Sequence, residues 1–144
     1  MHIYTQCGIP EYYSPEMISQ SGYNKSLDFW KLAILLYEML VGHTPFIDSA
    51  PVEILEKIKN CKIKFPKNII YAKSIIRHSL IADKNKRLGC TKKGIYEITQ
   101  SAFFEGFDWE GLLHRNLGPP FIPKINHAYS SPYKKLEDIH YEDI

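Results

Sequence analysis

Two acidic residues and one arginine are candidates for charged side chains that are buried in the folded core. Glu16 follows a proline, and Asp28 directly precedes an apolar Phe-Trp pair. A carboxylate buried without a partner is very costly, and Arg87, in the polar turn 83–89, could bind one of the two through a bidentate pair. The alternative is that each acid simply begins a helix, where the helix dipole favours negative charge.

The other reactive side chains form no pattern typical of an active site. The six histidines show no metal-ligand spacing, and the three cysteines are too few and too scattered for a disulfide framework or a four-ligand zinc site. The sequence has no Gly-rich phosphate loop and no Gly-x-Ser-x-Gly motif. Local chemistry alone therefore predicts a scaffold without a complete active site.

Length, charge and hydropathy narrow the class of protein. The 144 residues suffice for about one domain, and 44% of them are hydrophobic, which is enough for a core. The net charge of +2 gives no reason to expect a nucleic-acid or membrane partner. The longest apolar stretch, 29–41, is interrupted by Lys31 and Glu38 and is too short to span a bilayer. Few cysteines and no signal peptide favour the cytoplasm, with the nucleus as an alternative.

The hydrophobic pattern predicts a mainly α-helical domain followed by an extended tail. Residues 28–41 are apolar nearly all round, so we expect a helix buried on most sides and ended by Gly42. Ser49 is expected to cap the helix that follows Pro51. After Gly118 the repeated prolines predict an extended chain. Shorter helices are expected over residues 15–21, 71–82, 95–104 and 109–115.

Several separated motifs resemble, in their order and spacing, part of a protein-kinase domain. The segment from Thr5 to Glu16 resembles the end of an activation segment and closes on Ser-Pro-Glu instead of Ala-Pro-Glu. The motifs that follow are Gly22-Tyr-Asn-Lys25, Asp28-Phe-Trp30, Leu36-Tyr-Glu-Met39, Gly42-x-x-Pro-Phe46, Lys86-Arg-Leu-Gly89 and, typical of the AGC group, Pro120-Phe-Ile-Pro-Lys124. The resemblance, strongest to cyclic-AMP-dependent kinases, implies the helical C-lobe portion of a protein-kinase-like fold with an extended C-terminal tail.

The resemblance implies a peptide-binding surface. Gln6, Pro10 and Tyr13 match the loop that receives the residue after the phosphoacceptor. Glu11 and Glu38 match acids that bind arginines upstream of the phosphorylated Ser or Thr. The expected partners are therefore protein or peptide substrates with basic residues.

Three segments follow from the same resemblance. Residues 1–27 are the end of the activation segment and the substrate-facing loop, with Thr5 at the phosphosite, where a phosphate pairs with basic residues. Residues 28–117 are the helical C-lobe subdomain, and residues 118–144 are the AGC tail. In that tail Tyr133 begins a segment that resembles the family's nucleotide-proximal motif.

The family's scaffold residues also have counterparts. Glu16 and Arg87 match a buried ion pair between the activation segment and the helical subdomain. Asp28 matches the acid that begins the central helix and hydrogen-bonds the catalytic-loop backbone. Trp30 and Leu32 are then expected in the core.

Some residues depart from the family pattern. Ile9 stands where the family has a threonine whose hydroxyl contacts the catalytic Asp and Lys, which puts efficient phosphorylation in doubt. Ser21 and Leu55 replace the Lys and Tyr that grip the regulatory subunit of the cyclic-AMP-dependent enzyme. Binding to a regulatory subunit is therefore left open.

Several catalytic parts of the kinase family have no counterpart in these 144 residues. They are the Gly-rich loop, the strand lysine, the αC glutamate, the His-Arg-Asp loop and the Asp-Phe-Gly site. Phosphoryl transfer depends on those parts. We therefore predict a C-terminal fragment of a Ser/Thr kinase, inactive as this isolated chain. The parent would use ATP and Mg²⁺, and the chain alone is expected to hold no cofactor. The alternative is a pseudokinase-like module that binds basic peptides or a regulatory partner through Glu11, Glu38 and the helix near 54–58.

Overall fold

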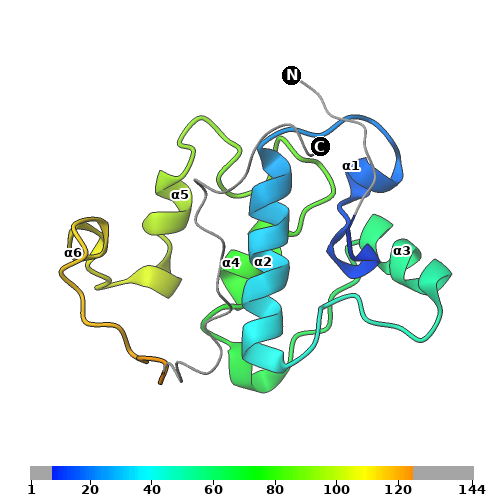
Figure 1. Ribbon diagram of the computed structural model, residues 1–144. Helices are drawn as coiled ribbons and strands as arrows, with labels where there is room; N and C mark the ends of the chain where they lie inside the picture. The colour runs from blue at the N-terminus through cyan, green and yellow to red at the C-terminus, as the bar shows by residue number, and fades with distance from the viewer. Residues whose placement is uncertain (1–7, 125–144) are drawn as a thin grey trace, which may run out of the picture. The chain divides into compact units, whose positions relative to one another are not determined.

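The longest helix that the structure describes is α2 (Ser26–Val41), against which α4 (Lys73–Ser79) packs (Figure 1). The computed structural model describes residues 8–124. As predicted, α2 ends at Gly42, whose φ of 89° lies in the left-handed region that glycine adopts without strain. The Gly42 N–H donates to the Glu38 carbonyl at 2.8 Å and closes the last turn.

Residues 8–107 belong to one compact unit and residues 108–124 to a second. The part of the chain that the structure describes contains no strand, so the prediction of a mainly α-helical fold is confirmed. In the second unit, α6 (Trp109–Leu113) begins at Asp108, whose carboxylate accepts a 2.8 Å hydrogen bond from the Gly111 N–H. The remaining helices of the first unit are η1 (Pro10–Tyr12), α1 (Pro15–Ile18), α3 (Pro51–Lys59), η2 (Lys67–Ile69), α5 (Tyr96–Thr99) and η3 (Ala102–Phe104).

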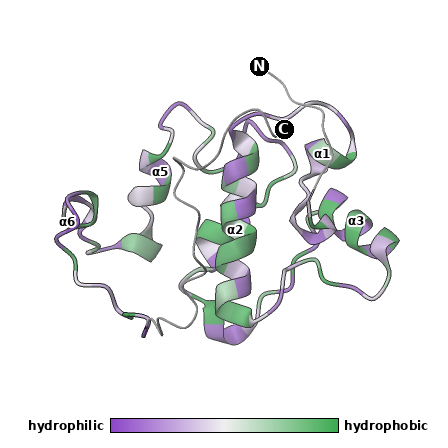
Figure 2. Ribbon diagram, viewed as in Figure 1, coloured by the Kyte–Doolittle hydropathy of each residue, from purple (hydrophilic) through white to green (hydrophobic). Residues whose placement is uncertain are grey.

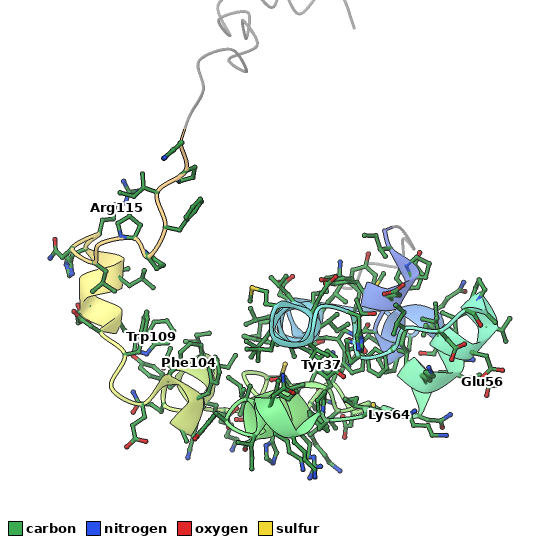
Figure 3. The ribbon with its side chains drawn as sticks, turned by 90° about the horizontal axis from the view of Figure 1, so that it is seen from below. Tyr37, Glu56, Lys64, Phe104, Trp109 and Arg115 are labelled. Carbon is green, nitrogen blue, oxygen red and sulfur yellow. The ribbon has the colours of Figure 1, made fainter. Side chains whose placement is uncertain are left out.

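The core of the first unit forms around one face of α2. Trp30 and Ile34 have no exposed surface, and Tyr37 is also buried, so the buried positions recur every three to four residues. The Trp30 ring stacks on Phe46 with centroids 5.7 Å apart. The Tyr37 hydroxyl donates to the Lys64 carbonyl at 2.8 Å, and Figure 3 labels both residues. This face therefore anchors the turn after α2 and the extended segment after α3.

The expectation that α2 is buried on most sides is wrong for the described residues. Leu32, expected in the core, is 47% exposed, and Leu35, Met39 and Leu40 are exposed as well. Apolar residues occur along the whole helix (Figure 2), but the described elements pack on the face that carries Trp30. The apolar composition of α2 would allow every face of the helix to be buried. Which face is buried depends on where the surrounding elements pack.

Helix starts and lengths differ from the predictions at several places. Ala50, not Ser49, is the N-cap of α3, and the Ser49 N–H and hydroxyl donate to the Asp48 carboxylate at 2.7 and 3.3 Å instead. The helices expected over 15–21, 71–82 and 109–115 are shorter, and the one expected over 95–104 is divided into α5 and η3. Ser101, with an extended backbone, separates these two helices.

Candidate functional site

Glu16 and Arg87 form a buried bidentate ion pair. Arg87 Nη1 and Nη2 each donate to one Glu16 carboxylate oxygen at 2.6 Å. Arg87 has no exposed surface and Glu16 is 4% exposed. Glu16 lies in the first turn of α1, which Ser14 caps through its hydroxyl and which begins with Pro15. Of the two acids that could bind Arg87, the structure therefore pairs it with Glu16.

The Arg87 guanidinium also joins three other parts of the first unit. Its Nε and Nη1 groups donate to the carbonyls of Ile81, at 2.9 Å, and Ser26, at 3.1 Å. Its carbon centre lies 4.8 Å from the Trp30 ring, a cation–π arrangement. The Trp30 indole N–H in turn donates to the Tyr13 carbonyl at 2.9 Å. The pair thus connects the 83–89 turn to α1, α2 and the loop before α1.

Burial and the neighbouring Arg87 have opposite effects on the pKa of Glu16. Burial raises the pKa of Glu16, but the hydrogen bonds and positive charge of Arg87 outweigh burial and leave that pKa below its usual value. Glu16 is therefore a carboxylate at neutral pH. Its ionisation contributes to stability above the unfolded-state pKa, and this contribution is lost as the pH falls through the folded-state pKa.

Glu11 and Glu38 each accept a hydrogen bond from a hydroxyl group. The Tyr12 hydroxyl donates to Glu38, and the Thr44 hydroxyl donates to Glu11. Together the hydrogen bond to Glu38, burial and the negative charges of both carboxylates raise the pKa of Tyr12 to about 12. Both carboxylates therefore act on one phenol, which places two partly exposed negative charges around it.

These two carboxylates have no cationic partner within residues 8–124. The ion pairs of that range involve other acids, which are Glu16, Asp48, Asp83 and Glu110. Each of the two predicted substrate-binding acids thus has a hydroxyl donor and no cationic partner in this part of the chain. Tyr12 and Thr44 were not predicted from the sequence. The signal available for Tyr12 was a hydroxyl residue adjacent to Glu11.

The loop before α1 holds the other described residues of the predicted peptide site. Pro10 is exposed and begins η1, which packs against α3. Tyr13 is partly buried, and its hydroxyl donates to the Gly8 carbonyl at 3.2 Å. Ile9, next to these residues, is 64% exposed. The structure therefore brings Pro10, Glu11 and Tyr13 into one short loop.

Three predicted site residues, Thr5, Gln6 and Tyr133, lie outside the described residues. Asp28, expected among apolar side chains, is exposed at the start of α2. It points away from the core because the neighbouring positions, Leu27 and Trp30, face inward.

No group of three His, Cys, Asp or Glu side chains between residues 8 and 124 is arranged to hold a metal ion. Among the helices of residues 8–124, none combines the length and hydrophobicity needed to cross a membrane.

Known proteins are similar to this chain over most of its length. The family described as the protein kinase domain matches residues 2–104. The cAMP-dependent protein kinase catalytic subunit PRKX of Mus musculus is 41% identical over 124 residues, which are 85% of this chain and 35% of that protein. The cAMP-dependent protein kinase catalytic subunit of Dictyostelium discoideum is 40% identical over 136 residues, 94% of this chain and 21% of that protein.

A kinase with a different name is also similar. Serine/threonine-protein kinase N2 of Danio rerio is 37% identical over 122 residues, 84% of this chain and 12% of that protein. The chain spans about a third or less of the length of each of these relatives. Because the family match covers more than half of the chain, the chain belongs to the protein kinase family and is similar to catalytic subunits of cAMP-dependent protein kinases.

Proposed function

We propose that this chain is the peptide-binding part of a protein serine/threonine kinase that acts on substrates with basic residues. The observation that supports this proposal is the pair of carboxylates, Glu11 and Glu38, around the Tyr12 hydroxyl. Both are partly exposed, and neither has a cationic partner in the described part of the chain. An arginine side chain of a substrate would supply the missing positive charge through charge-assisted hydrogen bonds.

The position of Glu38 within α2 strengthens this proposal. Glu38 lies between Tyr37, which is buried, and Met39, which is 67% exposed. A carboxylate at this border between buried and exposed side chains is accessible to a guanidinium group. The Tyr12 hydroxyl orients the Glu38 carboxylate and leaves it further lone pairs to accept hydrogen bonds.

Titration of the full chain with an arginine-containing peptide tests this proposal. We expect Glu38→Gln, which keeps the acceptor for Tyr12 but removes the charge, to weaken binding about fivefold or more. The matched control is Glu53→Gln, an exposed acid in the first turn of α3, which should leave the affinity within twofold. Equal affinities of the wild-type chain and Glu38→Gln would contradict the assignment.

The transfer step belongs to the whole kinase. The parent reaction would move the γ-phosphoryl group of ATP, with Mg²⁺, to a Ser or Thr hydroxyl. The 144 residues contain no counterpart of the phosphate loop, catalytic loop or metal site, so we propose that a polypeptide of this sequence does not phosphorylate substrates. Equilibrium dialysis with ATP and Mg²⁺ tests this, and measurable ATP binding would overturn it.

A second candidate function is a non-catalytic module that binds basic peptides or a regulatory partner. The observation that favours it is Ile9, an exposed aliphatic side chain at a position where the family resemblance places a threonine hydroxyl. Its binding surface would not include Ile54 and Ile58, because both are buried under the loop before α1. Sequencing the transcript upstream of Met1 distinguishes the two candidates. A catalytic loop and a metal-binding motif there favour the kinase, and the lack of both favours the module.

A further inference from the structure

A cavity of about 420 Å³ lies between the end of α3, the extended segment after it and α4. This volume is within the range of about 300–1,000 Å³ that is typical of ligand sites. Its walls combine apolar and cationic side chains. The lining includes Lys59, Ile63, Phe65, Arg77, Leu80 and Ile81.

The apolar lining follows from the geometry of the extended segment. Successive side chains of an extended chain point to opposite sides. Ile63 and Phe65 line this cavity, whereas Lys62 and Lys64 line a different cavity. Leu80, at the end of α4, is buried and contributes a further apolar wall. The cavity can therefore receive an apolar side chain.

The rim of the cavity is positively charged. Lys59 and Arg77 line it, and no aspartate or glutamate does. The Lys73 ammonium and the Arg77 guanidinium lie 5.8 and 5.4 Å from the centre of the Phe65 ring. Within the described range, none of these three cations forms an ion pair. An anionic group entering the rim would meet at least two cations, although Lys59 also lines a neighbouring cavity that includes Glu16 and Asp83.

The charge around the cavity is a local feature of the sequence. Residues 57–78 contain six lysines and one arginine and no acidic residue, whereas the rest of the chain carries more acidic than basic residues. The net charge of +2 conceals this separation. The attraction for anions is therefore concentrated on this part of the surface.

We infer that this cavity binds an acidic peptide segment of a partner protein, with an apolar side chain of the peptide inside the cavity and flanking carboxylates on Lys59 and Arg77. Single-stranded nucleic acids stack their bases on free aromatic faces, and the Phe65 ring already lies beside two cations. A membrane surface cannot enter a cavity, so its attraction would spread over the neighbouring lysines. The peptide uses both the apolar lining and the charged rim.

Fluorescence anisotropy tests this inference with the full chain and a labelled synthetic peptide, Asp-Glu-Phe-Glu-Asp. We expect Lys59→Glu and Arg77→Gln each to weaken binding about fivefold. Lys67→Glu, an exposed lysine outside the cavity, is the charge-matched control for Lys59→Glu and should change the affinity less than twofold. A peptide with serine in place of phenylalanine should bind about tenfold more weakly, because the buried ring is lost.

Other outcomes would overturn the inference. Equal weakening by Lys59→Glu and Lys67→Glu would mean diffuse attraction. Tighter binding of anionic phosphatidylserine vesicles or of a single-stranded oligonucleotide would assign the surface to another class of partner. No binding of the acidic peptide at millimolar concentration would also refute it. Glu38→Gln should leave the affinity for the acidic peptide unchanged, so this inference and the proposed function can fail separately.

Discussion

Replacement of Glu16 by alanine leaves a buried arginine without its counter-charge. Two unit charges about 4 Å apart attract by about 4 kcal/mol at an effective dielectric constant near 20. Removing one partner of a buried pair typically costs about 3–5 kcal/mol. The carbonyls of Ser26, Ile81 and Ala82 still accept hydrogen bonds from Arg87, at 3.1, 2.9 and 3.4 Å. We therefore expect Glu16→Ala to lower the free energy of unfolding by about 3 kcal/mol, the lower end of that range.

Urea unfolding of the full chain, followed by circular dichroism, measures this loss. The control is Asp83→Ala, which removes an exposed acid whose ion pair with Lys86 spans 3.7 Å. Such surface pairs contribute about 0–1 kcal/mol. Equal losses for Glu16→Ala and Asp83→Ala would refute the reasoning, because the buried pair would then have the energetics of a surface pair.

A double substitution keeps the test informative if Glu16→Ala does not fold. Replacing Glu16 and Arg87 together by methionine removes both charges and keeps most of the buried volume. Apolar replacement of a whole buried ion pair is often neutral or stabilising. The double variant should therefore be more stable than Glu16→Ala. A double variant that is less stable than Glu16→Ala would show that the contacts of Arg87 with carbonyls and Trp30 outweigh the ion pair.

Three further predictions concern titration and backbone strain. The lowered pKa of Glu16 should make stability fall as the pH drops below about 4.5, and urea midpoints of Glu16→Gln should depend less on pH there. The raised pKa of Tyr12 gives a stabilising contribution that is complete below pH 10 and is lost as the pH rises toward 12. In absorbance measurements, Tyr12→Phe should remove a phenol that titrates near 12. Gln20 is exposed with φ at 51°, so Gln20→Gly should raise the unfolding free energy by about 0.5–1 kcal/mol, whereas Ser19→Gly, at φ −82°, should lower it.

The sequence predicted the central helix because several local signals agree there. A long apolar segment followed by Gly42 set the end of α2, and the observed helix begins two residues before the predicted start at Asp28. The exposed face was not predictable, because Leu32 and Ile34 are equally apolar, yet Ile34 is fully buried whereas Leu32 is 47% exposed. Periodicity shows what a helix can bury, and only tertiary contacts select the buried face.

The candidate site was predictable where a charge had few available partners. Arg87 is one of three arginines, and the residues alone left Glu16 and Asp28 as its possible partners. Only the resemblance to protein kinases selected Glu16. The hydroxyl partners of Glu11 and Glu38 were not predictable in the same way. Thr44 lies 33 residues from Glu11, and hydroxyls are too common in the sequence for spacing to single one out. Contacts of neutral donors depend on how the loops close.

The position of Arg87 in the sequence also affects how the protein is made. Glu16 and Arg87 are separated by 71 residues, so the loop that their pair closes is long. During synthesis from the N-terminus, a nascent chain that has not reached Arg87 holds Glu16 without its partner, and α1 has no buried cation to dock on. The first unit therefore cannot complete its core stepwise as each helix emerges. Its final packing must wait for the 83–89 turn, and ribosome pausing before that turn would prolong the exposure of the apolar side chains of α2.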